Sequence, residues 1–125
     1  MLHKINLENV LFLDIETVPE YPYFDDQDAE EKQLWEQKTS FQRKDEFTPE
    51  EFYDRAGIWA EFGKIICISV GYFANKSDIR QFRTTSFYGE ETELLQEFKV
   101  LLETHFNRPQ QLLCAHNGKE FDFPY

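Results

Sequence analysis

The hydrophobic pattern begins with an apolar run at residues 10–13 that ends in two acids, Asp14 and Glu16. Alternate side chains of an extended strand point to opposite faces, so the two acids project to one side and Ile15 to the other. Apolar residues precede the acids on both faces, which predicts a central, doubly covered strand over residues 5–17. Two charges at the end of a buried strand are costly unless something neutralises them. The pair is therefore a candidate metal site, and the alternative is a strand that emerges into solvent at Asp14.

Later segments alternate between strand and helix periodicity. Residues 65–73 and 79–87 are rich in β-branched and aromatic side chains, and residues 75–78 between them have turn chemistry, so we expect an antiparallel meander with the first strand. Residues 90–107 repeat apolar positions at spacings of three and four, which predicts a helix. Its length suits a crossover to a parallel strand at residues 111–116.

An acidic and aromatic segment, residues 19–62, separates the first two strands and is predicted to be a helical insertion. One helix is expected over about residues 28–38. A second should begin at Thr48, which can cap, with Pro49 at the first helical position and Glu51 completing a capping box. The run of acids in this segment is typical of a solvated surface.

Composition narrows the class of protein. The chain has 125 residues, a length that predicts one domain. Its formal net charge of −11 argues against a broad basic surface for binding a nucleic-acid backbone. It has no signal-peptide pattern and no run near the roughly 20 apolar residues of a membrane span, so we expect a cytoplasmic location and no membrane partner. Cys67 and Cys114 lie in apolar segments without zinc-site or disulfide-framework spacing, which favours buried reduced thiols.

Two stretches carry a family resemblance, Asp14-Ile15-Glu16-Thr17 and His116-Asn117-Gly118-Lys119-Glu120-Phe121-Asp122. They resemble the first two motifs of the DEDD superfamily of 3′–5′ exonucleases, and most of all predicted bacterial exonucleases similar to the proofreading domain of family B DNA polymerases. The resemblance implies an α/β, ribonuclease H-like mixed sheet in the order 3-2-1-4, with the helical acidic insertion between strands 1 and 2.

The implied activity is removal of nucleotides from the 3′ end of single-stranded nucleic acid, DNA being favoured over RNA, with two Mg²⁺ or Mn²⁺ ions. Phosphodiester hydrolysis by two ions about 3.5–4 Å apart needs carboxylates around them, and Mg²⁺ prefers oxygen ligands. By resemblance, Asp14 would bridge both ions, Glu16 would bind one, and Asp122 would contribute from the turn after the fourth strand.

The resemblance also assigns substrate-binding residues. Thr17 would meet the 3′-terminal nucleotide, and Asn117 and Phe121 belong to the second motif, with a position in the core as the alternative for Phe121. His116 is expected to be structural, because the general base of the family lies in a third motif. Other aromatic residues of the insertion could stack on bases, but their acidic surroundings favour packing: Tyr21, Tyr23, Phe24 and Trp35.

The sequence departs from the family in one respect, since nothing after Asp122 supplies a fourth acid or a base. We therefore expect residues 1–125 to be the N-terminal part of a single exonuclease domain, truncated before its last strand and helices and inactive alone. The main alternative is a non-catalytic ribonuclease H-like module that binds nucleic acid or protein. A phosphotransfer enzyme with Asp14 as nucleophile is disfavoured, because residues 18–20 offer no phosphate-binding loop.

Overall fold

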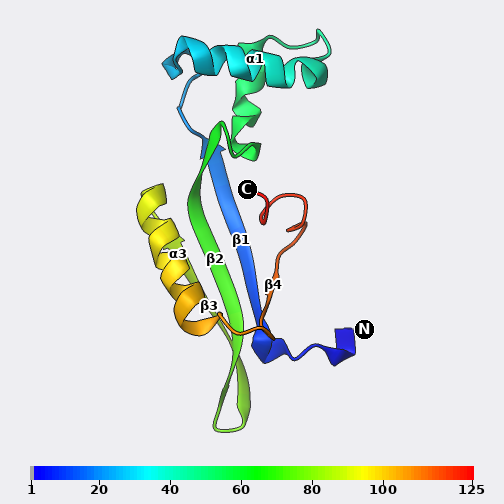
Figure 1. Ribbon diagram of the computed structural model, residues 1–125, viewed down its shortest axis with the longest axis vertical. Helices are drawn as coiled ribbons and strands as arrows, with labels where there is room; N and C mark the ends of the chain where they lie inside the picture. Colours follow the sequence, from blue (N-terminus) through cyan, green and yellow to red (C-terminus); the bar gives the residue numbers. More distant parts are fainter. Residues whose placement is uncertain (1) are drawn as a thin grey trace. The chain divides into compact units, whose positions relative to one another are not determined.

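The computed structural model describes residues 2–125 and has an α/β architecture with one four-stranded mixed sheet in the order β3-β2-β1-β4 (Figure 1), as predicted. The strands are β1 (Val10–Pro19), β2 (Gly63–Lys76), β3 (Ile79–Tyr88) and β4 (Leu112–Cys114). The α-helices are α1 (Ala29–Arg43), α2 (Pro49–Phe52) and α3 (Glu91–His105). The chain divides into two compact units. We call them the sheet unit, which holds the described residues up to Glu16 and Ile65–Tyr125, and the helical unit, Thr17–Lys64.

The first strand starts later than predicted. Leu2–Lys4 and Leu7–Asn9 form short 3-10 turns, so β1 begins at Val10 instead of residue 5. Asn6 caps the second turn, because its side chain accepts a hydrogen bond from the backbone N–H of Glu8 at 3.2 Å. A side chain that satisfies a nearby backbone donor in this way favours a turn over an extended strand.

The β2–β3 hairpin confirms the predicted antiparallel pairing. Its register runs from Cys67 opposite Tyr88 to Lys76 opposite Ile79. The two turn residues, Ser77 and Asp78, both have positive φ values of 53° and 63°, as a tight hairpin turn between twisted strands requires. Figure 1 shows that β1 and β2 run in opposite directions.

Helix α3 is the predicted crossover, because β1 and β4 pair in parallel on either side of it in the chain. The register places Val10 opposite Leu112 and Phe12 opposite Cys114. Strand β4 is only three residues long, shorter than the predicted 111–116, and all three of its side chains are exposed.

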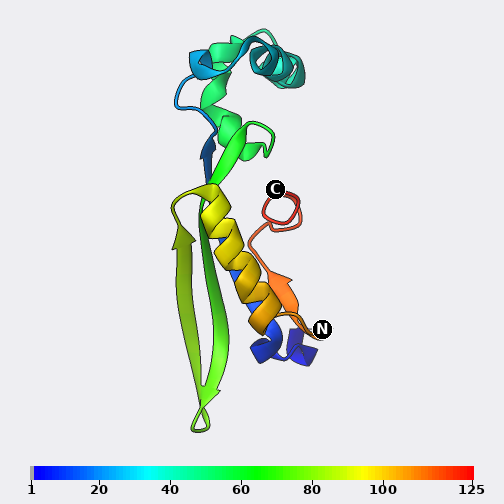
Figure 2. The ribbon, with the colours of Figure 1, turned by 60° about the vertical axis from the view of Figure 1, so that its left-hand side comes forward.

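Helix α3 lies along one face of the sheet unit (Figure 2). Beneath it a core forms from side chains of β1, β2 and α3: Leu11, Ile15, Ile68, Val70 and Leu94. The opposite face bears Phe12, Asp14 and Glu16, and we call it the acid-bearing face. No α-helix of the described sheet unit covers that face, and the 3-10 turn Leu7–Asn9 lies only at its end, where Leu7 lines a cavity with Phe12 and Glu8 pairs with Arg80. The expectation that β1 is covered on both sides was therefore wrong for this unit: neighbouring-strand rings, those of Phe73 and Phe82, shield Phe12.

In the helical unit, α1 begins where the sequence predicts and ends later. Asp28 and Glu31 form a reciprocal capping box at its start. The helix continues to Arg43 instead of residue 38, and the guanidinium of Arg43 then donates to the carbonyl oxygens of Glu36 (3.0 Å) and Phe47 (3.2 Å). A basic side chain that binds carbonyl groups near a helix C-terminus stabilises that end.

The second predicted helix start is confirmed, but the α-helix is short. Thr48 and Glu51 form the capping box, with Pro49 in the first turn. The α-helical hydrogen bonding stops at Phe52, and the chain continues as a 3-10 helix, Tyr53–Ile58.

Trp35 is the centre of the helical unit and is fully buried. Four aromatic rings surround it at centroid distances of 5.1–6.0 Å: Phe52, Tyr53, Trp59 and Phe62. Its indole N–H donates to the carbonyl oxygen of Pro49 at 2.8 Å, so the polar atom of this side chain is satisfied. The predicted packing role is confirmed for Trp35 and for Phe24, which contacts Tyr53 edge-on.

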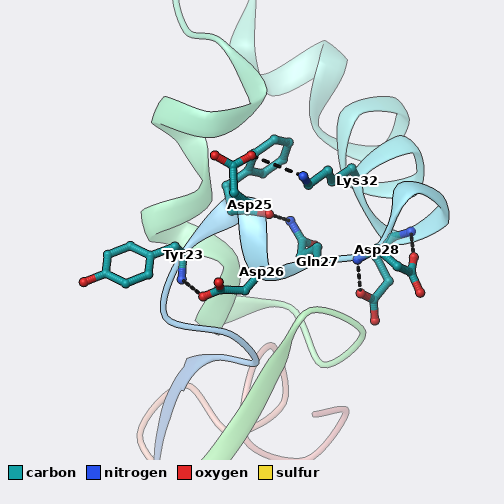
Figure 3. A network of polar contacts seen from close by, with 8 residues as sticks. Tyr23, Asp25, Asp26, Gln27, Asp28 and Lys32 are labelled. Atoms are coloured by element: carbon teal, nitrogen blue, oxygen red, sulfur yellow. Dashed lines mark hydrogen bonds and ion pairs between the residues drawn. The ribbon is translucent and has the colours of Figure 1, made fainter.

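The acidic run of the helical unit is a solvated surface, as predicted (Figure 3). Asp26 accepts from the backbone N–H of Tyr23 at 3.1 Å, and Asp25 pairs with Lys32 at 3.2 Å. Tyr23 itself is 73% exposed. Asp25 and Asp26 therefore each have a local partner within this exposed segment.

Two further expectations concern the whole chain. Cys67 and Cys114 are free thiols, as predicted, but Cys67 is half-buried and Cys114 is exposed, because β4 is a short edge strand. Within residues 2–125, no helix combines the length and apolar character needed to cross a bilayer.

Candidate functional site

The middle of β1 presents two carboxylates on one face of the sheet unit. Asp14 and Glu16 are exposed, whereas Ile15 between them is 8% exposed and points into the core under α3. This is the alternation predicted from the sequence. The buried isoleucine holds the strand in register, so both acids face solvent on the acid-bearing face.

The second motif meets the first at this point. The side chain of Asp122 accepts a hydrogen bond from the backbone N–H of Ile15 through Oδ1, at 3.2 Å. Strand β4 ends opposite Phe12, so it provides no ladder partner as far along as Ile15. Asp122, 107 positions after Ile15, thus satisfies a backbone donor that lies between the two acids of β1.

A compact turn after β4 positions Asp122. Asn117 has a left-handed conformation (φ 55°), which asparagine tolerates better than most residues, and its carbonyl oxygen accepts from the N–H groups of Glu120 and Phe121 at 3.1 Å each. A Cβ atom on buried Gly118 would lie 2.7 Å from Cβ of Ala115 and 2.8 Å from the ring of Phe123. The conformation and packing of this turn therefore account for Asn117 and Gly118 without any contact to a substrate.

The remaining predicted residues are placed as follows. Phe121 is half-buried, packs against the core cluster and contacts the ring of Tyr125 at 5.4 Å, which supports the alternative of a core position. Asn117 and His116 are exposed, and the structural role expected for His116 stays a prediction. Thr17 is the first residue of the helical unit, and its predicted contact with substrate stays a prediction.

The donor atoms suit a hard cation, although they do not form a ready-made site. Carboxylate oxygens are the ligands that Mg²⁺ and Mn²⁺ prefer, and the site offers Asp14, Glu16 and Asp122. Within residues 2–125, no three His, Cys, Asp or Glu side chains are grouped so that they could hold a metal ion together.

A groove beside Asp14 was not predicted from the sequence. It has a volume of about 350 Å³ and lies on the acid-bearing face, between β1 and the hairpin. Its lining includes hydroxyl groups and one aromatic ring from the hairpin: Ser69, Thr84, Ser86 and Phe82. The signal that could have found it is the alternation along β3, since even-numbered positions from 80 to 86 share one face once the hairpin register is known.

Comparison with protein-family models, with curated proteins and with solved structures found no match for this chain.

Proposed function

We propose that this chain carries the first two acidic motifs of a two-metal-ion 3′–5′ exonuclease on a ribonuclease H-like scaffold. The observation that supports this proposal is the hydrogen bond from Ile15 N–H to Asp122, which joins the two motifs. The sheet order 3-2-1-4 and the parallel β1–β4 pair are compatible with the same scaffold.

Asp14, Glu16 and Asp122 would hold two Mg²⁺ or Mn²⁺ ions. When bound, such ions activate the attacking water and neutralise the leaving oxygen of a phosphodiester. Asp14 and Glu16 contribute by presenting two carboxylates on one face of a strand fixed by the buried Ile15 side chain. The Ile15 N–H donates to Oδ1 of Asp122 and so orients this carboxylate. Rotation of the Asp122 side chain would adjust its other oxygen for metal binding.

The substrate that suits this arrangement is the 3′ end of a single-stranded nucleic acid, with DNA favoured over RNA. A net charge of −11 repels a phosphate backbone, so the cations would also serve to neutralise the site for its substrate. Exposed Asn117 lies in the turn that carries Asp122 and is a candidate contact for the terminal nucleotide.

Titration calorimetry with Mn²⁺ tests the proposal directly. Metal binding is the readout, because the base and fourth acid of the family have no counterpart among these 125 residues. We expect two sites, with Asp14→Asn lowering affinity at least tenfold and Glu16→Gln weakening it similarly. Glu120→Gln is the matched control, since Glu120 is an exposed acid two residues before Asp122.

Wild-type protein that binds no Mn²⁺, or binds it equally well with Asp14→Asn, would contradict the exonuclease proposal. That result would favour the non-catalytic module instead, since such a module needs no cations at these three acids. Release of 3′ nucleotides from a labelled oligonucleotide, abolished by Asp14→Asn, would contradict the expectation that these 125 residues are inactive alone.

A further inference from the structure

The acid-bearing face continues past Asp14 onto the hairpin with a definite order of side chains. Strand β3 places four residues on this face at alternate positions: Arg80, Phe82, Thr84 and Ser86. The register sets them opposite Asn75, Phe73, Gly71 and Ser69 of β2. From Ser86 to Arg80 the row spans six residues, about 20 Å at about 3.4 Å per residue.

Hydroxyl groups come first, next to the acids. The Oγ atoms of Ser69 and Ser86 are 2.9 Å apart, and both residues line the groove with Thr84 and Asp14. Hydroxyl groups donate to phosphate and sugar oxygens without discriminating between bases. This part of the groove has the chemistry to meet a nucleic-acid backbone.

An aromatic ring comes next. Phe82 is 53% exposed, although its ring is held by Phe12 (centroids 6.0 Å apart) and Phe73 (5.0 Å). The ring lies over Gly71, where a Cβ atom would be 2.4 Å from its tip. The absence of a side chain at Gly71 is what lets the ring lie there, and an exposed, firmly held ring is a platform on which a base can stack.

A cation ends the row. The guanidinium of Arg80 lies 5.7 Å from the centroid of the Phe73 ring and pairs with Glu8 at 3.1 Å. Its side chain is 53% exposed. Surface ion pairs of this kind contribute little free energy to stability. Arg80 can therefore exchange Glu8 for a phosphate group with little loss of stability.

We propose that this row is a track for a single-stranded nucleic acid, which leads its 3′ end to Asp14 and Glu16. The assignment rests on the proposed function, because the acids give the track its direction. Phosphate and sugar would meet Ser69, Thr84 and Ser86, one base would stack on Phe82, and a phosphate further along the strand would meet Arg80.

Strand β3 provides matched controls, because it carries the same residue types on its opposite face. Arg83 and Thr85 lie opposite Tyr72 and Val70, on the face that α3 covers, and both are exposed. Binding of fluorescein-labelled dT10 and rU10 is measured by anisotropy, in Mn²⁺ and in EDTA, across a range of salt concentrations. Unfolding midpoints of every variant are measured alongside.

We expect Arg80→Gln to weaken binding and to reduce the slope of log affinity against log salt by about 0.7, the value for one phosphate contact on a single strand. Phe82→Leu, which keeps an apolar side chain, should weaken binding about fivefold or more, and Phe82→Trp should retain it. Thr84→Ala should weaken binding more than Thr85→Ala. Arg83→Gln should leave the salt slope unchanged.

Several results would overturn the track. They are the absence of binding to either oligonucleotide, equal effects of Arg80→Gln and Arg83→Gln, and unaltered affinity in Phe82→Leu. If these occur while Mn²⁺ still binds through Asp14, the track fails and the exonuclease proposal stands. If oligonucleotides bind through Arg80 and Phe82 but Mn²⁺ does not bind, the track stands as a binding surface and the exonuclease proposal fails. The dT10 and rU10 arms identify which nucleic acid it takes.

Discussion

The carboxylate of Asp122 accepts a hydrogen bond from the backbone N–H of Ile15, 107 positions earlier in the chain. The contact gives Asp122 two separable roles. Its oxygen satisfies a part-buried backbone donor, and its charge is available to a cation in the proposed site.

Substitutions at Asp122 should therefore separate stability from metal binding. Asp122→Ala leaves the Ile15 N–H without an acceptor, and we expect the free energy of unfolding to fall by about 1 kcal/mol. Asp122→Asn keeps an acceptor oxygen and should unfold nearly as the wild type does, while Mn²⁺ affinity falls in both variants. Urea melts and Mn²⁺ titrations measure the two effects. Equal stability of Asp122→Ala and wild type would show that the hydrogen bond contributes nothing.

Trp35 should be the most sensitive position of the helical unit. Trp35→Ala removes a fully buried ring from contact with four others and leaves a cavity, so we expect a loss of about 3–5 kcal/mol. Phe41 is 86% exposed on the same helix, and Phe41→Ala should change stability by less than about 0.5 kcal/mol. Chemical denaturation followed by circular dichroism at 222 nm compares the two. Similar losses in both variants would contradict the assigned core.

The helical unit should lose stability in alkaline solution. Burial raises the pKa of Tyr53 above 10.0, and the neighbouring Glu31 carboxylate raises that of Tyr21. Above about pH 10 the unfolded chain therefore loses these protons before the folded chain does, and the free energy of unfolding falls as pH rises through the folded values. Below pH 10 this contribution is fully present.

Tyr53→Phe removes one of these linkages. The variant should be about 1 kcal/mol less stable at pH 7, because Tyr53 Oη accepts from the N–H of Tyr21, yet its stability should fall less steeply above pH 10. Urea melts from pH 7 to 11 measure both effects. A slope equal to that of wild type would show that Tyr53 does not contribute, leaving the linkage to Tyr21.

Gly71 and Phe82 should be energetically coupled. Gly71→Ala places a methyl group against the Phe82 ring, and we expect a cost of about 1–3 kcal/mol from displacement of the ring. In a Phe82→Leu background the same substitution should cost less, because the side chain there is smaller and more adaptable. A double-mutant cycle from urea melts measures the coupling, and additive effects would place the two side chains out of contact.

Local sequence patterns predict much of this fold because their causes are local. The Thr48 capping box, the turn at Ser77 and Asp78, and the apolar repeat of α3 each act within a few residues. The crossover followed from the length of that helix and the strand after it. Alternation at Asp14, Ile15 and Glu16 likewise needed no tertiary information.

Features that depend on distant partners were missed. The short β4 leaves the Ile15 N–H to a carboxylate far along the chain, whereas the late start of β1 has a local cause, the Asn6 side chain that binds its own turn. The groove depends on the hairpin register, which sets Ser86 beside Ser69 and lets Phe82 lie over Gly71. The pairings of Ile15 with Asp122, Ser86 with Ser69 and Phe82 with Gly71 have no signature within a short window of sequence.

Among the residues that the structure describes, β3 is hydrogen-bonded to a strand on one side only, so the outer edge of its ten residues is open to a further strand. Open edges of this length invite pairing between molecules, and charged side chains are a common protection against it. Arg80 and Arg83 put positive charge on both faces of this edge, and a second copy of β3 brought alongside would set like charges against each other. The two arginines therefore also act against self-association of an otherwise uncharged strand.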